Sequence, residues 1–217
     1  MIKLPCLIFS ALSLLLPTSV LAKQYDINLT GAVTWAFEFE NQPWFYGFRD
    51  LATNGVDKPV LNVFRMFGKM SGKRASVTSR RMTPLQNIVD SSVRTPQSDI
   101  GALASVDKKT AAVMVWNYHD LDVKSAAEPV QLNIDGVPAK SVTLTHYTID
   151  STHSNSYEVW KSMGSPKSPT SAQIATLEKA GQLATVGKPS KKPVTGGKLV
   201  VDISLPRQAV SLIKLDW

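Results

Sequence analysis

Short apolar or alternating runs recur along the chain from residue 73 onward. Turn-forming pairs, among them Asp135-Gly136 and Gly196-Gly197, separate several of these runs and mark tight turns. Strands that are short, closely spaced and divided by turns are typical of an antiparallel β-sandwich. The pattern predicts strands over residues 74–79, 100–107, 111–118, 130–134, 141–149, 198–205 and 209–217.

Helical spacing interrupts the strand pattern between residues 154 and 183. The first helical stretch, residues 154–163, ends at Gly164. The second begins near Thr170, a residue suited to capping a helix, and repeats apolar side chains at Ile174, Leu177 and Ala180. We therefore expect a mainly β fold in which an antiparallel sandwich carries a short helical insertion.

A different pattern occupies residues 31–70. The run from Gly31 to Phe39 is apolar, β-branched and aromatic on both alternating faces, as in a strand covered on both sides in a parallel sheet. Residues 40–55 are rich in aromatic and turn-forming residues, which indicates a long loop. Pro59 then opens a predicted helix. These residues form one β-loop-α unit, which leaves both edges of its strand unpaired.

The first 22 residues have the features of a secretory signal. Lys3 gives a charged start, an apolar stretch runs from Leu4 to Leu16, and Val20-Leu21-Ala22 supplies small residues near a cleavage point. No later stretch has the roughly 18 to 20 consecutive apolar residues of a membrane-spanning helix. We expect a secreted or periplasmic protein without a membrane partner. The predicted divisions are the signal at 1–22, the β-loop-α unit at 23–72 and the sandwich at 73–217.

Cysteine usage and charge add two limits. Cys6 is the single cysteine and lies inside the predicted signal, so the mature protein would have no disulfide. The formal net charge is +7, which raises the question of a polyanionic partner. The basic residues are scattered over short loops, as at Lys73-Arg74, Arg80-Arg81 and Lys188 to Lys192. We interpret them as a solvated rim and expect no nucleic-acid partner.

Three longer blocks carry a resemblance to a known family. They are TWAFEFENQPWFYGFRDLATNGVDKPVLNVFRMFGKM at 34–70, LTHYTIDSTHSNSYEVWKSMGSPKSP at 144–169 and SLPRQAVSLIKLDW at 204–217. They resemble the closing third of glycoside hydrolase family 39 β-xylosidases. The resemblance implies that the first block is the last β/α unit of a (β/α)8 barrel and that the other two belong to an accessory β-sandwich. It also implies a xylo-oligosaccharide or a related β-glycoside as substrate, and no cofactor.

The same resemblance bears on catalysis. Retaining hydrolysis needs two carboxyl groups about 5 to 5.5 Å apart on opposite sides of the scissile bond. In the family they come from the fourth and seventh barrel strands, whereas this chain resembles the eighth. Glu38 and Glu40 lie two residues apart on one strand, from which they cannot easily bracket a glycosidic bond. We predict a truncated family member that holds no catalytic residue and does not hydrolyse glycosides by itself.

The resemblance further implies a part in sugar binding for the strand end and its loop. An indole offers a flat apolar face to sugar C–H bonds, and a carboxylate accepts hydrogen bonds from hydroxyls. The alternative is that Trp35, Phe37 and Phe39 are core residues and that only the glutamates and Trp44 face a pocket. The strand register leaves both open. The predicted substrate-binding residues are Trp35, Glu38, Glu40 and Trp44.

Two other hypotheses stand beside the truncated glycosidase. One is a non-catalytic secreted β-sandwich module that binds carbohydrate or a partner protein through a row of surface aromatic residues; the other is a decayed gene. The aromatic candidates are Trp116, Tyr118, Tyr147 and Trp160. The histidines lack metal-ligand spacing, so we expect no metal. These histidines are His119, His146 and His153. No feature of the sequence indicates an oligomeric state.

Overall fold

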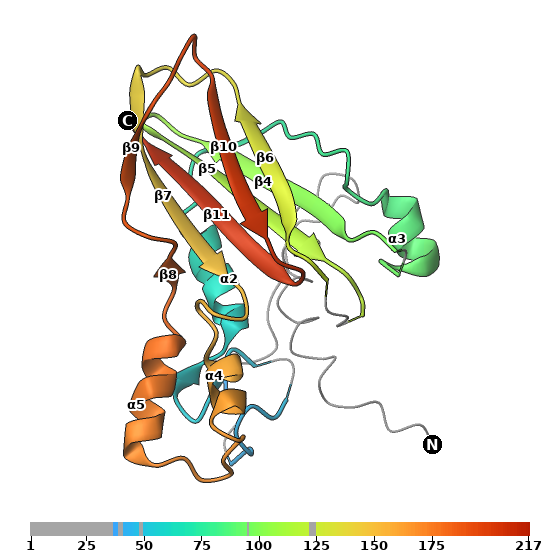
Figure 1. The fold of residues 1–217 in the computed structure, drawn as a ribbon, viewed down its shortest axis with the longest axis vertical. Helices are drawn as coiled ribbons and strands as arrows, with labels where there is room; N and C mark the ends of the chain where they lie inside the picture. The colour runs from blue at the N-terminus through green and yellow to red at the C-terminus, as the bar shows by residue number, and fades with distance from the viewer. Residues whose placement is uncertain (1–36, 39–40, 48–49, 95, 122–124) are drawn as a thin grey trace. The chain divides into compact units, whose positions relative to one another are not determined.

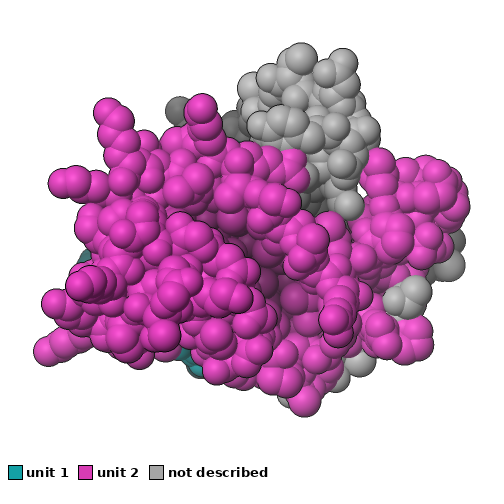
Figure 2. Space-filling view, turned by 90° about the horizontal axis from the view of Figure 1, so that it is seen from above, with its two compact units in different colours: residues 1–65, 149–184 teal, residues 66–148, 185–217 magenta. Residues whose placement is uncertain are grey.

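The computed structural model describes residues 37–38, 41–47, 50–94, 96–121 and 125–217. The chain divides into two compact units (Figure 2). Unit 1 comprises residues 1–65 and 149–184, and unit 2 comprises residues 66–148 and 185–217. The predicted signal, and the predicted strand from Gly31 to Phe39 except Phe37 and Glu38, lie outside the described residues. The predicted domain limits stay a prediction.

Unit 2 is built on a seven-stranded sheet with the order β3-β4-β5-β11-β7-β8, in which β9 also pairs with β7 (Figure 1). The pairs β3–β4, β4–β5, β5–β11 and β7–β9 are antiparallel. The strand bounds are β3 (Lys73–Ala75), β4 (Asp99–Val106), β5 (Thr110–Tyr118), β7 (Ser141–Ile149), β8 (Ala184–Thr185), β9 (Ser190–Pro193) and β11 (Ala209–Asp216).

A second, two-stranded sheet pairs β6 (Glu128–Ile134) with β10 (Leu199–Leu205). Side chains alternate along β6, so Val130 and Leu132 pack on the buried Ile100, Ala102 and Val115 of the larger sheet. Towards the other end of the strands, the core consists of Val137, Val142, Leu144, Leu199, Ile213 and Leu215. The antiparallel sandwich and the mainly β class predicted from the sequence are confirmed.

Six of the seven predicted strands keep their positions to within two residues, and the first is shorter than predicted. The run from 74 to 79 ends as a strand at Ala75. The Ser79 hydroxyl donates to the Ile100 carbonyl at 2.6 Å and accepts from the Arg81 N–H at 3.2 Å, which favours a turn over a continued ladder. Strands β8 and β9 and the helix α3 (Leu85–Ser91) were not predicted from the sequence.

Both predicted tight turns have glycines in the left-handed region, with φ of 77° at Gly136, 59° at Gly196 and 73° at Gly197. However, the Asp135-Gly136 turn follows β6 and precedes β7, which belong to different sheets. The glycine pair likewise leads from β9 to β10. Both turns therefore lie where the chain passes from one layer of the sandwich to the other. The glycine pair also closes a short antiparallel bridge, in which the Thr195 N–H donates to the Lys198 carbonyl at 3.1 Å and the Lys198 N–H to the Thr195 carbonyl at 3.0 Å.

Unit 1 contains the helical insertion and the residues that precede α2. The insertion is confirmed as α4 (Ser156–Ser162) and α5 (Ser171–Ala180), and α2 (Pro59–Phe67) begins at the predicted proline. Thr170 and Gln173 form a capping box at the start of α5. A hairpin of β1 (Ala52–Thr53) and β2 (Val56–Asp57) precedes α2. None of the helices in the described part of the chain is long and apolar enough to span a bilayer.

A buried amide explains why the insertion folds with residues far away in the sequence. The Asn62 side chain is fully buried and donates to the Ser154 carbonyl at 3.1 Å and to the Gly181 carbonyl at 2.8 Å. The Ser156 hydroxyl donates to the Asp57 carbonyl at 2.5 Å. A Cβ atom at Gly181 would lie 2.8 Å from the same carbonyl oxygen. These contacts require a glycine at 181 and join both ends of the insertion to α2 and β2.

The two aromatic residues proposed as a surface row on β5 are buried, so that form of the binding-module hypothesis is wrong. Trp116 is only 1% exposed, and Tyr118 is also buried. The Trp116 indole N–H donates to Asp99 Oδ2 at 2.8 Å, and a Cβ at Gly101 would lie 2.2 Å from the indole ring. Trp116 fills the interior of unit 2, where Gly101 makes room for its ring.

We predict that Asp99→Asn lowers the free energy of unfolding by about 1.5 to 3 kcal/mol. Asp99 is buried and accepts hydrogen bonds from Trp116 and from the Thr83 N–H at 2.6 Å. An asparagine would face one of these two donors with its own N–H groups. Urea unfolding measures the change. The control is Asp202→Asn, because Asp202 accepts from Gln131 on the exposed face of β10. Equal effects of the two substitutions would contradict the prediction.

Candidate functional site

The hairpin β1–β2 orients the one predicted glutamate that the structure describes. Its turn is Asn54-Gly55, with φ of 46° and 80°, as a two-residue hairpin turn of type I′ requires. The Gly55 N–H donates to Glu38 Oε1 at 2.9 Å and Oε2 at 3.2 Å. Residues 40–55 were predicted as a long loop, although the Asn-Gly pair is a signal for this hairpin. The half-buried Glu38 carboxylate is therefore held at the tip of a hairpin.

A buried ion pair fixes the loop of residues 41–47, which lies between Glu38 and the hairpin in the sequence. This loop is here called the aromatic loop. Lys58 and Asp50 are only 7% and 3% exposed, and their Nζ and Oδ1 atoms lie 2.5 Å apart. Lys58 Nζ also donates to the carbonyl oxygens of Tyr46 at 3.0 Å and Gly47 at 3.4 Å. The three ammonium protons therefore have three acceptors, two of which belong to the aromatic loop.

The aromatic loop packs on helix α4 of the same unit. The Phe45 ring centroid lies 5.5 Å from that of Tyr157 and 5.1 Å from that of Trp160, and these two rings stack at 5.8 Å. Phe45 has a positive φ of 55°, and its N–H donates to the Thr53 hydroxyl at 2.9 Å. Contacts with helix α4, with Thr53 of the hairpin and with Lys58 together fix the course of the aromatic loop.

The predicted sugar-binding residues lie in the aromatic loop, at the hairpin and outside the described residues. Trp44 is half-buried, with its ring centroid 6.5 Å from that of Phe45. Trp35 and Glu40 lie outside the described residues, so the structure describes only Glu38 and Trp44 of the proposed set. The alternative that Phe37 is a core residue is wrong, because Phe37 is 57% exposed. Tyr46, which the sequence analysis did not single out, is equally exposed at 57%.

Three described carboxylates of unit 1, those of Asp50, Asp57 and Asp150, are engaged in structural contacts. Asp57 Oδ2 lies 2.6 Å from Arg65 Nη2, and Asp50 pairs with Lys58. Burial alone would raise the pKa of Asp150, but hydrogen bonds from the Thr152 N–H and hydroxyl and from His153 outweigh it and hold the pKa below its ordinary value. A general acid needs the opposite shift. Asp150 is therefore not poised for proton donation, and the ion pairs of Asp50 and Asp57 stabilise the fold.

In unit 2, hydrogen bonds likewise lower the pKa of the Asp120 carboxylate. Asp120 accepts from the hydroxyls of Ser92 and Tyr118, both at 2.9 Å, and from Arg94 Nε at 2.9 Å. Burial opposes ionisation of Asp120, yet these donors lower its pKa below the ordinary value. For Tyr118, burial and the hydrogen bond to Asp120 raise the phenol pKa above its usual range. This network attaches the segment after α3 to the end of β5.

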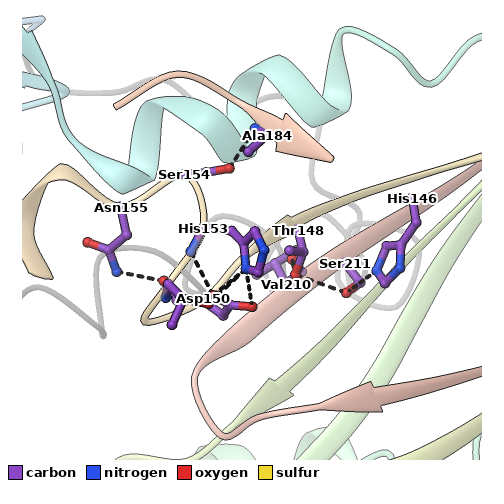
Figure 3. A network of polar contacts seen from close by, with 10 residues as sticks. His146, Thr148, Asp150, His153, Ser154, Asn155, Ala184, Val210 and Ser211 are labelled. Carbon is purple, nitrogen blue, oxygen red and sulfur yellow. Dashed lines mark hydrogen bonds and ion pairs between the residues drawn. The ribbon is translucent and has the colours of Figure 1, made fainter. Parts of the chain in front are cut away.

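The three histidines have protein partners (Figure 3 shows two of them). In unit 2, His146 Nε2 lies 2.9 Å from the hydroxyl of the buried Ser211, and the Leu121 N–H donates to His119 Nδ1 at 3.0 Å. In unit 1, His153 Nδ1 lies 3.0 Å from Asp150 Oδ1. Among the described residues, no group of three metal-ligating side chains lies together. The histidine contacts are structural hydrogen bonds.

We predict that Lys58→Met destabilises the protein by about 3 to 5 kcal/mol, because it leaves the buried Asp50 carboxylate without a partner. Urea unfolding monitored by tryptophan fluorescence measures the effect. The matched control is Lys161→Met, which removes a pair of 2.6 Å between half-exposed Lys161 and Glu158. The control should cost no more than about 1 kcal/mol. A Lys58→Met variant as stable as the control would show that the ion pair does not anchor the aromatic loop.

Several solved structures share the fold of this chain. The GH39 enzyme from Xanthomonas axonopodis pv. citri has a TM-score of 0.72 and 18% identity, over 97% of this chain and 41% of that chain. A monomeric β-xylosidase from Caulobacter crescentus CB15 has a TM-score of 0.74 and 16% identity, over 97% of this chain and 42% of that chain. This chain therefore spans about two fifths of the length of these enzymes.

A bacterial orthologue of human α-L-iduronidase is similar over a shorter length, with a TM-score of 0.58, 20% identity, and coverage of 74% of this chain and 27% of that chain. At such identities the likeness shows the fold alone. No curated protein matches the chain. The family model described as glycosyl hydrolases family 39 matches residues 22–196, which is most of the sequence. The chain belongs to glycosyl hydrolases family 39.

Proposed function

We propose that the chain supplies the C-terminal portion of a secreted or periplasmic β-glycosidase and contributes to its sugar-binding surface. The proposed substrate is a xylo-oligosaccharide or a related β-glycoside. The observation that carries the proposal is the aromatic loop, which Lys58 and helix α4 hold beside the hairpin that orients Glu38. The family match over residues 22–196 and the fold likeness to β-xylosidases support it.

The loop and hairpin provide the contacts that a sugar needs. Trp44 is half-buried and Tyr46 exposed, so their rings offer flat apolar faces to sugar C–H bonds. The Glu38 carboxylate has lone pairs beyond those used by the Gly55 N–H, and these can accept hydrogen bonds from sugar hydroxyls. Trp35 and Glu40 are the other two residues of the proposed binding set.

We propose further that the chain does not hydrolyse glycosides by itself. Retaining hydrolysis needs one carboxyl group kept protonated and a second about 5 to 5.5 Å away. The carboxylates of Asp50 and Asp57 are paired with Lys58 and Arg65, and hydrogen bonds hold the pKa of Asp150 below its ordinary value. The catalytic pair is therefore assigned to barrel strands other than the one that this chain resembles.

Hydrolysis of a chromogenic β-xyloside by the purified chain tests this proposal. We expect no turnover above background, and the same result for Glu38→Gln and Glu40→Gln. Turnover that disappears in either variant would overturn the proposal and identify a catalytic carboxylate in this chain. Circular dichroism of each sample shows that the protein is folded, so that absent turnover reports on chemistry.

Binding of xylotriose, followed by tryptophan fluorescence, is the companion measurement. Trp44→Ala should weaken binding by about tenfold, from the loss of about 1.4 kcal/mol of stacking. Tyr147→Ala is the control, because Tyr147 is a half-buried aromatic residue of unit 2 with Lys69 Nζ 4.8 Å from its ring centroid. Unchanged binding in Trp44→Ala would contradict the assignment of the aromatic loop to sugar binding.

The proposed export is tested by expressing the chain from residue 1 in a Gram-negative host. We expect the protein in the periplasm or medium, with an N-terminus close to residue 23, because residues 1–22 have the composition of a cleaved signal. N-terminal sequencing makes the measurement. A product that retains residues 1–22 in the cytoplasm would contradict export.

A further inference from the structure

Basic residues that are scattered along the sequence lie together at one end of unit 2. Strand β4 ends at Val106 and β5 begins at Thr110, so the turn that contains Lys108 and Lys109 lies at this end. Lys73 is paired with Val106 across β3 and β4, which places the start of β3 there as well. The N–H of Trp217, which follows β11, donates to the Lys109 carbonyl at 3.0 Å.

Strand β9 brings further lysines to the same end. Lys192 pairs with Val142, and the Val194 N–H donates to the Lys140 carbonyl at 2.9 Å. Val142 belongs to the core cluster against which Trp217 packs, and Trp217 is bonded to the Lys109 carbonyl. The chain then turns at residues 195–198 and enters β10. The basic end of unit 2 consists of Lys73, Arg74, Lys108, Lys109, Lys140, Lys191, Lys192 and Lys198, all of them exposed.

Few described carboxylates balance this charge. Asp107 and Asp135 lie among the basic residues, and Asp135 is 3.8 Å from Lys198 in a pair that is largely exposed. Asp216 is paired with Lys214 on β11. Within the described part of the chain, no carboxylate forms an ion pair with Lys108, Lys109 or Lys192. The basic end is therefore a local excess of positive charge.

We propose that the basic end of unit 2 docks an anionic polysaccharide, a chain that carries uronic-acid carboxylates. The proposal deepens the proposed function, since it names a polymeric substrate class for the same protein. It places contact with the polymer on unit 2, whereas the proposed sugar-binding residues lie in unit 1. The lysines would attract the carboxylates of the polymer from solution.

The length of the basic end suits an extended polymer. From β3 to β9 the basic end crosses five strand intervals of the larger sheet, about 24 Å at 4.8 Å for each interval. The membership of a glycosidase family favours a saccharide over a nucleic acid as this polymer.

An aromatic side chain and a cleft accompany the basic residues. Trp217 is half-buried and lines a cleft of about 1080 Å³ between the two sheets, beside Val106, Ala111 and Asp135. Figure 2 looks onto this end, where the surface of unit 2 is hollowed. The backbone bond from the Trp217 N–H to the Lys109 carbonyl places this aromatic residue beside the β4–β5 turn, and an indole can stack on a sugar ring. Charge and stacking are thus available within one surface.

The test compares two polymers that differ only in charge. Isothermal titration of the full chain with 4-O-methylglucuronoxylan should show binding, and the carboxyl-reduced polymer should bind about tenfold more weakly or not at all. Binding of the acidic polymer should decline from about 0.05 M to about 0.5 M salt, because added ions screen exposed charges. Equal binding of both polymers would overturn the proposal.

Matched variants locate the surface. The variant Lys108→Gln/Lys109→Gln/Lys192→Gln should lose about tenfold in affinity for the acidic polymer. The control variant also removes three exposed charges, two in unit 1 and one near the opposite end of β4, and should change the affinity by less than about twofold. The control substitutions are Arg94→Gln, Lys167→Gln and Lys179→Gln. Equal losses in both variants would show that only net charge matters.

Two further results separate this proposal from its rivals. Tighter binding of a DNA duplex at the same ionic strength would assign the basic end to nucleic acid and overturn the polysaccharide. Trp44→Ala should weaken xylotriose and leave the carboxyl dependence of polymer binding unchanged. If Trp44→Ala has no effect on xylotriose but the lysine variant loses the acidic polymer, then the proposed function fails and the docking surface survives.

Discussion

The buried ion pair between Lys58 and Asp50 is the interaction on which the candidate site depends. Two charges removed from water must find partners for all their polar atoms, and Lys58 finds two of its three acceptors in the backbone of the aromatic loop. The loop therefore cannot move without exposing or orphaning a charge. Phe45 then carries this constraint to α4, about 110 residues further along the chain, through its contacts with Tyr157 and Trp160.

The sandwich was largely predictable from the sequence, and the site was predictable only in part. Strands such as β5 and β7 have a period-two or fully apolar pattern that is local, so their positions followed from the residues alone. The shortened β3 and the course of the chain at Asp135-Gly136 depend on hydrogen bonds and sheet partners that a local pattern does not contain. Trp116 was predicted as a possible surface residue because core and surface strands share the same alternation.

Within the site, the Asn54-Gly55 pair was a readable signal for the hairpin that orients Glu38. Lys58 and Asn62 had no such signal, because their partners are backbone carbonyls brought near by the fold. The clustering of the basic residues also could not be predicted from the sequence. The lysines of the basic end come from five separate stretches of sequence, and only the register of β3, β4, β7 and β9 reveals that they share one end of the sandwich.

The most direct test of the central claim is a crystal structure of the chain soaked with xylotriose. The account predicts a sugar ring stacked on the Trp44 indole, with a hydroxyl within hydrogen-bond distance of the Glu38 carboxylate and with the Lys58–Asp50 pair intact. Xylotriose bound elsewhere, with Trp44 and Glu38 untouched in a crystal where both are open to solvent, would contradict the account.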